Sequence, residues 1–171
     1  QLLEQAMSAN LLGNATIASS DTQAEAFWKI RDTIAEAERA AGPALQHDIS
    51  VPVAAMARFI EVEAPPIEAT YPGTKTLAFG HLGDGNIHYT VFPTRDDPAL
   101  YDAVVEAVED VVQALHGSFS AEHGVGLSKL NSMARRKDPV ALDVMRAVKQ
   151  ALDPDNRMNP GKVVPAKDST R

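Results

Sequence analysis

Two short stretches of the sequence gather residue types that can do chemistry together. Residues 80–88 read Gly-His-Leu-Gly-Asp-Gly-Asn-Ile-His, and residues 120–126 read Ser-Ala-Glu-His-Gly-Val-Gly. They contain three of the five histidines and five of the ten glycines in the chain. Glycine lets the backbone turn sharply or approach a ligand, and histidine beside a carboxylate binds divalent metals or transfers protons. We therefore expect one site built from both stretches.

The histidines and the acid of these stretches form a candidate metal centre. His81 and His88 are seven residues apart, and a tight turn between them lets both side chains point into one pocket. Glu122 is a candidate third ligand from the second stretch. Two imidazoles and one carboxylate suit Zn²⁺, Mn²⁺ or Fe²⁺ and leave positions open for a substrate.

His123 follows Glu122 directly, and adjacent side chains of extended backbone point to opposite sides. The two residues therefore need not share one role. His123 is a candidate general base, because a free imidazole has a pKa of about 6.5. The competing interpretation is that these histidines are hydrogen-bonded residues of the core or of loops.

Alternating residue patterns predict the strands that position the first stretch. Strands over 75–79 and 86–92 flank Asp84-Gly85, which is typical of a hairpin turn. On the second strand the alternation places Asn86, His88 and Thr90 on one face, and apolar residues on the other. Further candidate strands cover residues 15–18, 44–49 and 118–121.

Helical spacing and capping residues predict the elements between these strands. The candidate helices cover residues 2–12, 22–41, 97–117 and 139–151, with shorter ones starting near Pro52 and Leu127. Strands that alternate with helices around a central hairpin favour an α+β fold. We expect a ferredoxin-like antiparallel sheet with helices packed on one face, followed by a C-terminal helical tail.

Composition narrows the classes of function. A chain of 171 residues can form one domain with a substantial core. Its net charge of -7 argues against a nucleic-acid binder, and the absence of cysteine excludes thiolate ligands and thiol catalysis. No apolar run reaches the roughly 20 residues of a membrane span. The first residue is Gln, so we expect the chain to be a piece of a longer protein.

Three motifs of the chain resemble those of a known family. Residues 80–88, Glu122-His123-Gly124-Val125-Gly126 and Asn159-Pro160-Gly161-Lys162 are similar to signatures of the C-terminal domain of FAD-linked oxidases, in the vanillyl-alcohol-oxidase group. That family includes D-lactate dehydrogenase, the glycolate oxidase catalytic subunit and D-2-hydroxyglutarate dehydrogenase. Residues 48–52 also match its strand-to-helix segment, and the resemblance covers residues 15–164.

The resemblance implies a role for each site residue. His81, His88 and Glu122 would hold a divalent metal, Zn or Mn, which the 2-hydroxy acid substrate would chelate. His123 would take the hydroxyl proton while a hydride leaves Cα for the flavin. By the same resemblance, two residues would contact the substrate, namely Arg31 and Thr90, and one would approach the flavin ring, namely Asn159.

The resemblance also implies a division of labour between two parts of one protein. FAD would be bound mainly by an N-terminal domain of the same protein, and this chain lacks that domain. We therefore expect residues 1–171 to be a C-terminal substrate and cap domain that is inactive alone. We expect a bacterial cytoplasmic protein, or one held at a membrane surface by an electron-acceptor partner, and a homodimer is left open.

Two departures from the family pattern bear on the substrate. Gln46 stands where the 2-hydroxyglutarate enzymes have a substrate-contacting Lys, and Ala35 stands where they have a Thr. Both changes disfavour a second carboxylate, so we expect D-lactate or glycolate as substrate. The alternatives are a stand-alone metal-dependent hydrolase and a non-catalytic ferredoxin-like module.

Overall fold

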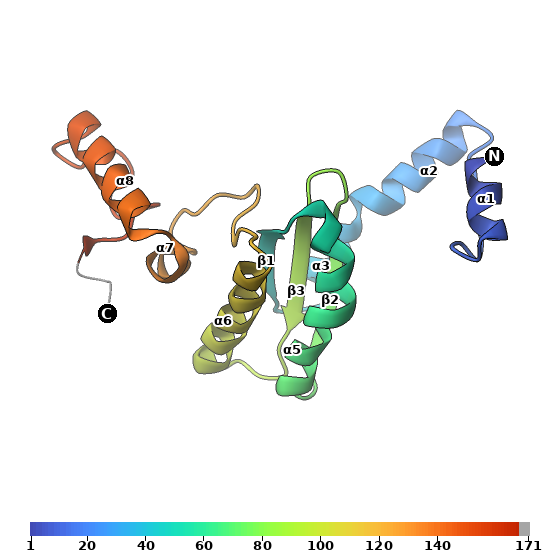
Figure 1. Cartoon of the computed structure of the whole chain (residues 1–171), viewed down its shortest axis with the longest axis horizontal. Helices are drawn as coiled ribbons and strands as arrows, with labels where there is room; N and C mark the ends of the chain where they lie inside the picture. The colour runs from blue at the N-terminus through green and yellow to red at the C-terminus, as the bar shows by residue number, and fades with distance from the viewer. Residues whose placement is uncertain (168–171) are drawn as a thin grey trace. The chain divides into compact units, whose positions relative to one another are not determined.

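The structure is a computed structural model that describes residues 1–167 (Figure 1). In chain order its elements are α1 (Leu2–Ser8), α2 (Asp21–Asp32), α3 (Ile34–Ala40), β1 (Leu45–Ser50), a 3₁₀ turn (Val53–Ala55), α4 (Met56–Arg58), a π turn (Phe59–Glu63), α5 (Pro65–Thr70), β2 (Lys75–His81), β3 (Asn86–Phe92), α6 (Pro98–Ala114), α7 (Leu130–Arg136) and α8 (Pro139–Leu152). They group into two compact units, Gln1–Gly42 and Pro43–Arg171.

The first unit differs from the sequence prediction in three places. Helix α1 ends at Ser8, four residues before the end of the helix predicted over 2–12. The helix expected over 22–41 is broken at Thr33, whose hydroxyl donates to the carbonyl oxygens of Lys29 (2.9 Å) and Ile30 (3.1 Å). Such bonding of a side chain to the preceding turn bends or ends helices. Residues 15–18 form no strand, so that prediction is wrong. Four residues carry too little pattern to specify a strand.

The second unit is built on an antiparallel sheet of strand order β1-β3-β2. The strand predictions for 44–49, 75–79 and 86–92 are confirmed, as is the hairpin between the last two. The register pairs Asp48 and Phe79 with His88, and it pairs Ile49 with Ile87. Because side chains alternate along a strand, Asp48, Phe79 and His88 share one face of the sheet, which we call the site face.

The opposite face of the sheet carries the hydrophobic core. Its strand residues pack against the residues of α5 and α6, which lie on the same side of the sheet (Figure 1). The ring of Phe59 meets that of Tyr89 edge to face, with centroids 5.4 Å apart. The buried apolar core residues are Ile49, Val51, Met56, Phe59, Ala64, Ile67, Ile87, Tyr89, Val91, Val104, Val108, Val112 and Leu115. The α+β fold is thus confirmed.

The segment after α6 lies along the free edge of β1. Ser118 forms an isolated antiparallel bridge with Ser50, with N–O distances of 2.9 and 2.8 Å, so the strand predicted over 118–121 is reduced to one pair. Gly117 precedes it, and a Cβ there would lie 2.1 Å from the carbonyl oxygen of Ser50. This bridge stands where a four-stranded ferredoxin-like sheet has its last strand, and it brings residues 120–126 to β1.

Ion pairs and the C-terminal tail complete the second unit. Arg135 of α7 bonds to Asp102 (3.1 Å) and Glu106 (2.9 Å) of α6, and Arg136 pairs with the buried Glu109 (3.1 Å). After α8 the chain returns to the second stretch, where the N–H of Val163 donates to the carbonyl of Gly126 at 2.8 Å. The predicted helical tail is confirmed. Among residues 1–167, every helix is too short or too polar to cross a bilayer.

His47 of β1 makes stability depend on pH. Burial lowers its pKa from 6.5 to about 4, although its Nδ1 lies 3.0 Å from the carbonyl oxygen of Tyr89. Since the unfolded chain binds the proton more tightly, neutral His47 contributes fully above about pH 6.5, and this contribution falls as the pH drops towards 4. We expect a loss of about 3 kcal/mol over this range relative to His47→Asn, measured by urea unfolding. Parallel pH curves for the two proteins would contradict it.

Candidate functional site

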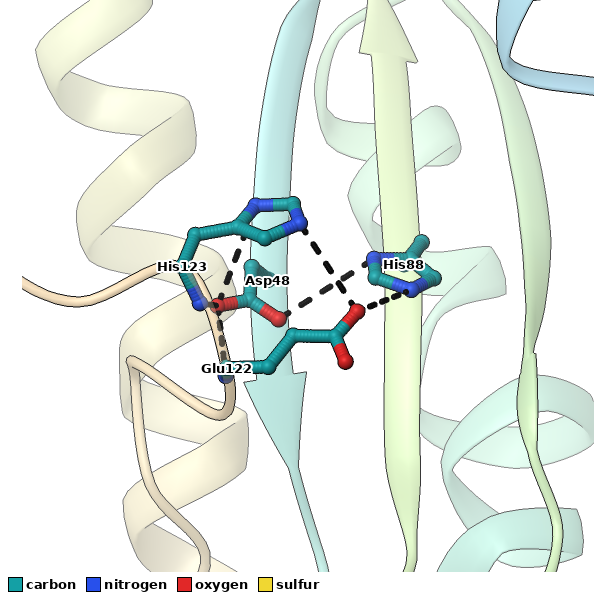
Figure 2. A group of neighbouring side chains, drawn as sticks. All are labelled: Asp48, His88, Glu122 and His123. Atoms are coloured by element: carbon teal, nitrogen blue, oxygen red, sulfur yellow. Dashed lines mark hydrogen bonds and ion pairs between the residues drawn. The ribbon is translucent and has the colours of Figure 1, made fainter.

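Four side chains converge on the site face from three parts of the chain. Asp48 comes from β1, His88 from β3, and Glu122 and His123 from the loop after α6 (Figure 2). One ligand atom from each of the four lies within 4.8 Å of the others. The two sequence stretches and β1 therefore meet in one cluster, which contains the candidate residues His88, Glu122 and His123.

His88 is the centre of this cluster. Its Nε2 lies 3.0 Å from Oε1 of Glu122, and its Nδ1 lies 4.0 Å from Oδ1 of Asp48. The ring of His123 stacks on that of His88 with centroids 5.4 Å apart, and His123 Nε2 is 3.7 Å from the same Glu122 oxygen. His88 is mostly buried, whereas the side chain of His123 is 63% exposed. One histidine is thus fixed in the site, and the other can reach a substrate.

Asp48 holds the second stretch against the sheet. Its Oδ2 accepts the backbone N–H groups of Ala121 (3.2 Å), Glu122 (3.0 Å) and His123 (2.8 Å). Burial alone would raise the pKa of Asp48, but the N–H groups of His123 and Glu122 and the charge of Lys129 outweigh it and hold the pKa below its usual value. The carboxylate is therefore charged at neutral pH.

The ammonium group of Lys129 also holds this loop against β1. It donates to Oγ of Ser120 (3.0 Å) and to the carbonyl oxygen of Phe119 (3.2 Å). It also donates to Asp48, through the carbonyl oxygen at 3.3 Å and Oδ2 at 3.5 Å. Burial lowers the pKa of Lys129, and the negative charge of Asp48 opposes that change. The loop that carries Glu122 and His123 is thus held by charges of both signs.

His81 lies at the end of β2, beside the cluster. It pairs with Asn86 across the hairpin, which puts it on the site face, and its ring packs edge to face on His88 with centroids 5.8 Å apart. It does not belong to the group whose ligand atoms lie within 4.8 Å of one another. Gly85 allows the turn of this hairpin to lie close to Val51. Its φ is +80°, and a Cβ there would lie 2.0 Å from the carbonyl oxygen of Val51.

The other predicted site residues lie in different places. Thr90 is buried on the site face next to His88, and its cross-strand neighbour on β1 is Gln46. Asn159 begins a turn in which its carbonyl oxygen accepts the N–H of Lys162 at 3.2 Å, four residues before Val163 bonds to the second stretch. Arg31 is an exposed residue of α2 in the first unit, beside Asp32 at 3.4 Å.

Asp48 is the site residue that sequence reasoning missed. The sequence does contain a signal, because an acid in the middle of a short strand is unusual and invites a partner. Its cross-strand partner, however, is His88, 40 positions along the chain, and that pairing is visible only from the register.

The donor atoms of the cluster fit a divalent metal ion. Imidazole nitrogens and carboxylate oxygens are the ligands that Zn²⁺ and Mn²⁺ take in proteins. Oδ1 of Asp48 is buried and has no hydrogen-bond partner within the described part of the chain, although Oδ2 has three N–H donors. Metal-binding histidines usually donate their second ring N–H to an acceptor, and Oδ1 of Asp48, which faces Nδ1 of His88, can be that acceptor.

Comparison with known proteins gives one family. The family described as "FAD linked oxidases, C-terminal domain" matches residues 1–163. A protein of Xanthomonas citri pv. viticola named D-2-hydroxyglutarate dehydrogenase is 33% identical over 97% of this chain and 36% of its own length. The mitochondrial D-2-hydroxyglutarate dehydrogenase of Rattus norvegicus is 33% identical over 97% of the chain and 31% of its length.

A plant relative gives the same result. The probable mitochondrial D-2-hydroxyglutarate dehydrogenase of Oryza sativa subsp. indica is 32% identical over 95% of this chain and 29% of its own length. The chain therefore spans about a third of the length of these curated relatives.

Lys129→Met tests the loop anchor. The substitution leaves the buried Asp48 carboxylate without its cation, so we expect a loss of about 2–3 kcal/mol in the free energy of unfolding at pH 7. Lys75→Met, at the exposed start of β2, is the control and should change stability by less than about 0.5 kcal/mol. Urea unfolding measures both, and equal effects would show that Lys129 does not anchor the loop.

Proposed function

Because this chain belongs to the family of FAD-linked oxidase C-terminal domains, we propose that it is the substrate- and metal-binding domain of an FAD-dependent D-2-hydroxy-acid dehydrogenase. The observation that carries the proposal is the grouping of His88, Glu122 and His123 on the site face of the sheet, with a 3.0 Å contact from His88 to Glu122. The relatives' names, all D-2-hydroxyglutarate dehydrogenases, support oxidation of a 2-hydroxy acid.

His81, His88 and Glu122 would hold the divalent metal ion, Zn or Mn. When bound, such an ion lowers the pKa of a coordinated hydroxyl group. The packing of His81 on His88 and the contact of His88 with Glu122 support this ligand set.

His123 would be the general base of the oxidation. Its exposed ring stacks on His88, so a hydroxyl group bound beside His88 would lie within its reach. His123 takes the hydroxyl proton as the C–O bond becomes a carbonyl, and the hydride of Cα leaves as the 2-oxo acid forms. When bound, FAD would supply the acceptor for that hydride.

Asn159 would face the flavin from the C-terminal tail. The hydrogen bond from Val163 to Gly126 ties its turn to the loop of His123, which supports a shared substrate region. FAD itself would be bound mainly by an N-terminal part of the same protein, in agreement with the relatives being about three times longer than this chain.

The proposal also concerns which 2-hydroxy acid is the substrate. On the site face the position next to Asp48 and His88 is filled by Gln46 and Thr90, which bring no charge for a second carboxylate. This pair supports D-lactate or glycolate, with Thr90 as a substrate contact, whereas the names of the relatives favour D-2-hydroxyglutarate.

The remaining alternatives have less support. Family membership favours an oxidoreductase over a metal-dependent hydrolase or a non-catalytic module. The relatives come from bacteria and from mitochondria, and we propose the bacterial cytoplasm for this chain.

His123→Asn tests the proposed chemistry in the full-length, flavin-loaded protein that contains this chain. We expect the rate of flavin reduction by D-lactate, followed by stopped-flow absorbance, to fall about 10²–10⁴-fold, because the proton acceptor is lost. Metal content should stay unchanged. His116→Asn is the matched control, since His116 is exposed beyond the end of α6, and it should leave the rate unchanged. Full activity of His123→Asn would reject His123 as the base, and wild-type protein without flavin reduction would reject the proposed function.

Gln46→Lys tests the substrate proposal in the same protein. A new cation beside Thr90 should raise kcat/KM for D-2-hydroxyglutarate relative to D-lactate by about tenfold, because hydrogen bonds to charged groups contribute about 1.5–3 kcal/mol. Gln46→Met, of similar length and without charge, should not raise the ratio. A wild-type preference for D-2-hydroxyglutarate would overturn the assignment of a monocarboxylate substrate.

A further inference from the structure

Asp48 uses its two carboxylate oxygens for different neighbours. Oδ2 accepts three backbone N–H groups of residues 121–123 and lies 3.5 Å from the ammonium of Lys129. Oδ1 is buried, has no hydrogen-bond partner within the described residues, and lies 4.0 Å from Nδ1 of His88. Asp48 is only 2% exposed, so bulk solvent does not reach this oxygen. A buried acceptor without a donor is costly, which indicates a partner in the working site.

We propose that Asp48 is a positioning residue of the metal centre, and that its Oδ1 holds the N–H at Nδ1 of His88, so that Nε2 keeps its lone pair free for the ion that it would share with Glu122. This inference rests on the proposed function, because it concerns the same site. In the structure Nε2 of His88 is already the nitrogen that faces Glu122, at 3.0 Å, while Nδ1 faces Asp48 (Figure 2).

The chemistry of histidine explains the arrangement. A neutral imidazole carries its proton on one nitrogen, and a ligand nitrogen must be free of it. An acceptor at Nδ1 therefore selects the ring orientation and tautomer that bind through Nε2. Because Oδ2 of the same carboxylate fixes the backbone of Glu122 and His123, Asp48 sets the positions of two candidate ligands, His88 and Glu122, and of the base relative to one another.

Asp48→Asn separates the two jobs of the carboxylate. The amide oxygen can take the place of Oδ2 and accept the three backbone N–H groups, which leaves an NH₂ group in the place of Oδ1. That group cannot accept a hydrogen bond from the N–H at Nδ1 of His88. We expect Zn²⁺ affinity of the chain, measured by chelator competition, to fall about 10–100-fold. In Asp48→Ala both oxygens are lost, so the amide protons of residues 121–123 should also lose protection from hydrogen exchange.

Asp153→Asn is the matched control. Asp153 is also buried and accepts the backbone N–H groups of Arg157 and Met158, both at 2.8 Å, yet it has no contact with the histidine cluster. The same substitution there should leave Zn²⁺ affinity unchanged.

A second measurement needs no variant. In ¹⁵N NMR spectra of the Zn²⁺-loaded wild-type chain, His88 should bind through Nε2 and show an Nδ1 proton that exchanges slowly with water. Ligation through Nδ1 would overturn the proposal even if Asp48→Asn failed to fold. Undiminished Zn²⁺ affinity of a folded Asp48→Asn protein would overturn it as well. Neither result depends on flavin reduction, so this proposal and the oxidase proposal can fail separately.

Discussion

The site depends on one carboxylate that receives three backbone N–H groups. Oδ2 of Asp48 accepts from Ala121, Glu122 and His123, and this joins β1 to a loop more than 70 residues away in sequence. Hydrogen bonds to a charged group contribute about 1.5–3 kcal/mol each, so together they can hold a loop whose backbone bonds to β1 are the Ser50–Ser118 bridge and the bond from Ala121 N–H to the carbonyl oxygen of Asp48. This anchor therefore helps to fix Glu122 and His123 relative to His88.

The sheet can carry such a polar site because one of its faces forms the hydrophobic core and the other carries the site residues. Ile87 and Tyr89 are buried against α5 and α6 on the core face, and each contributes about 1.5–3 kcal/mol by leaving water. His88, between them in sequence, points to the other face and is free to serve the site. Each strand therefore supports the fold and the site at alternate residues.

Short sequence patterns predicted those elements that form between residues close together in the chain. The Asp84-Gly85 turn and the alternation of residues 86–92 specify the hairpin, and the Asp97 cap specifies the start of α6. The contact of Asp48 with the second stretch depends on strand register and on a loop 73–75 residues away, so no short pattern contains it. The break at Thr33 was missed because Thr is common within helical patterns, and its bond to the preceding turn is decided by the rotamer.

The charges of the cluster argue for a metal ion in the working site. Asp48 and Glu122 bring two negative charges, and Lys129 brings one positive charge that is directed at Asp48 and the loop. Counting the histidines as neutral, an anionic 2-hydroxy acid would meet net negative charge. At 4 Å, like charges repel by about 4 kcal/mol at an effective dielectric constant of about 20. A divalent cation would reverse the sign and attract the substrate carboxylate. The acids that would repel an anionic substrate are the same ones that would hold such a cation, so metal and substrate binding should be linked.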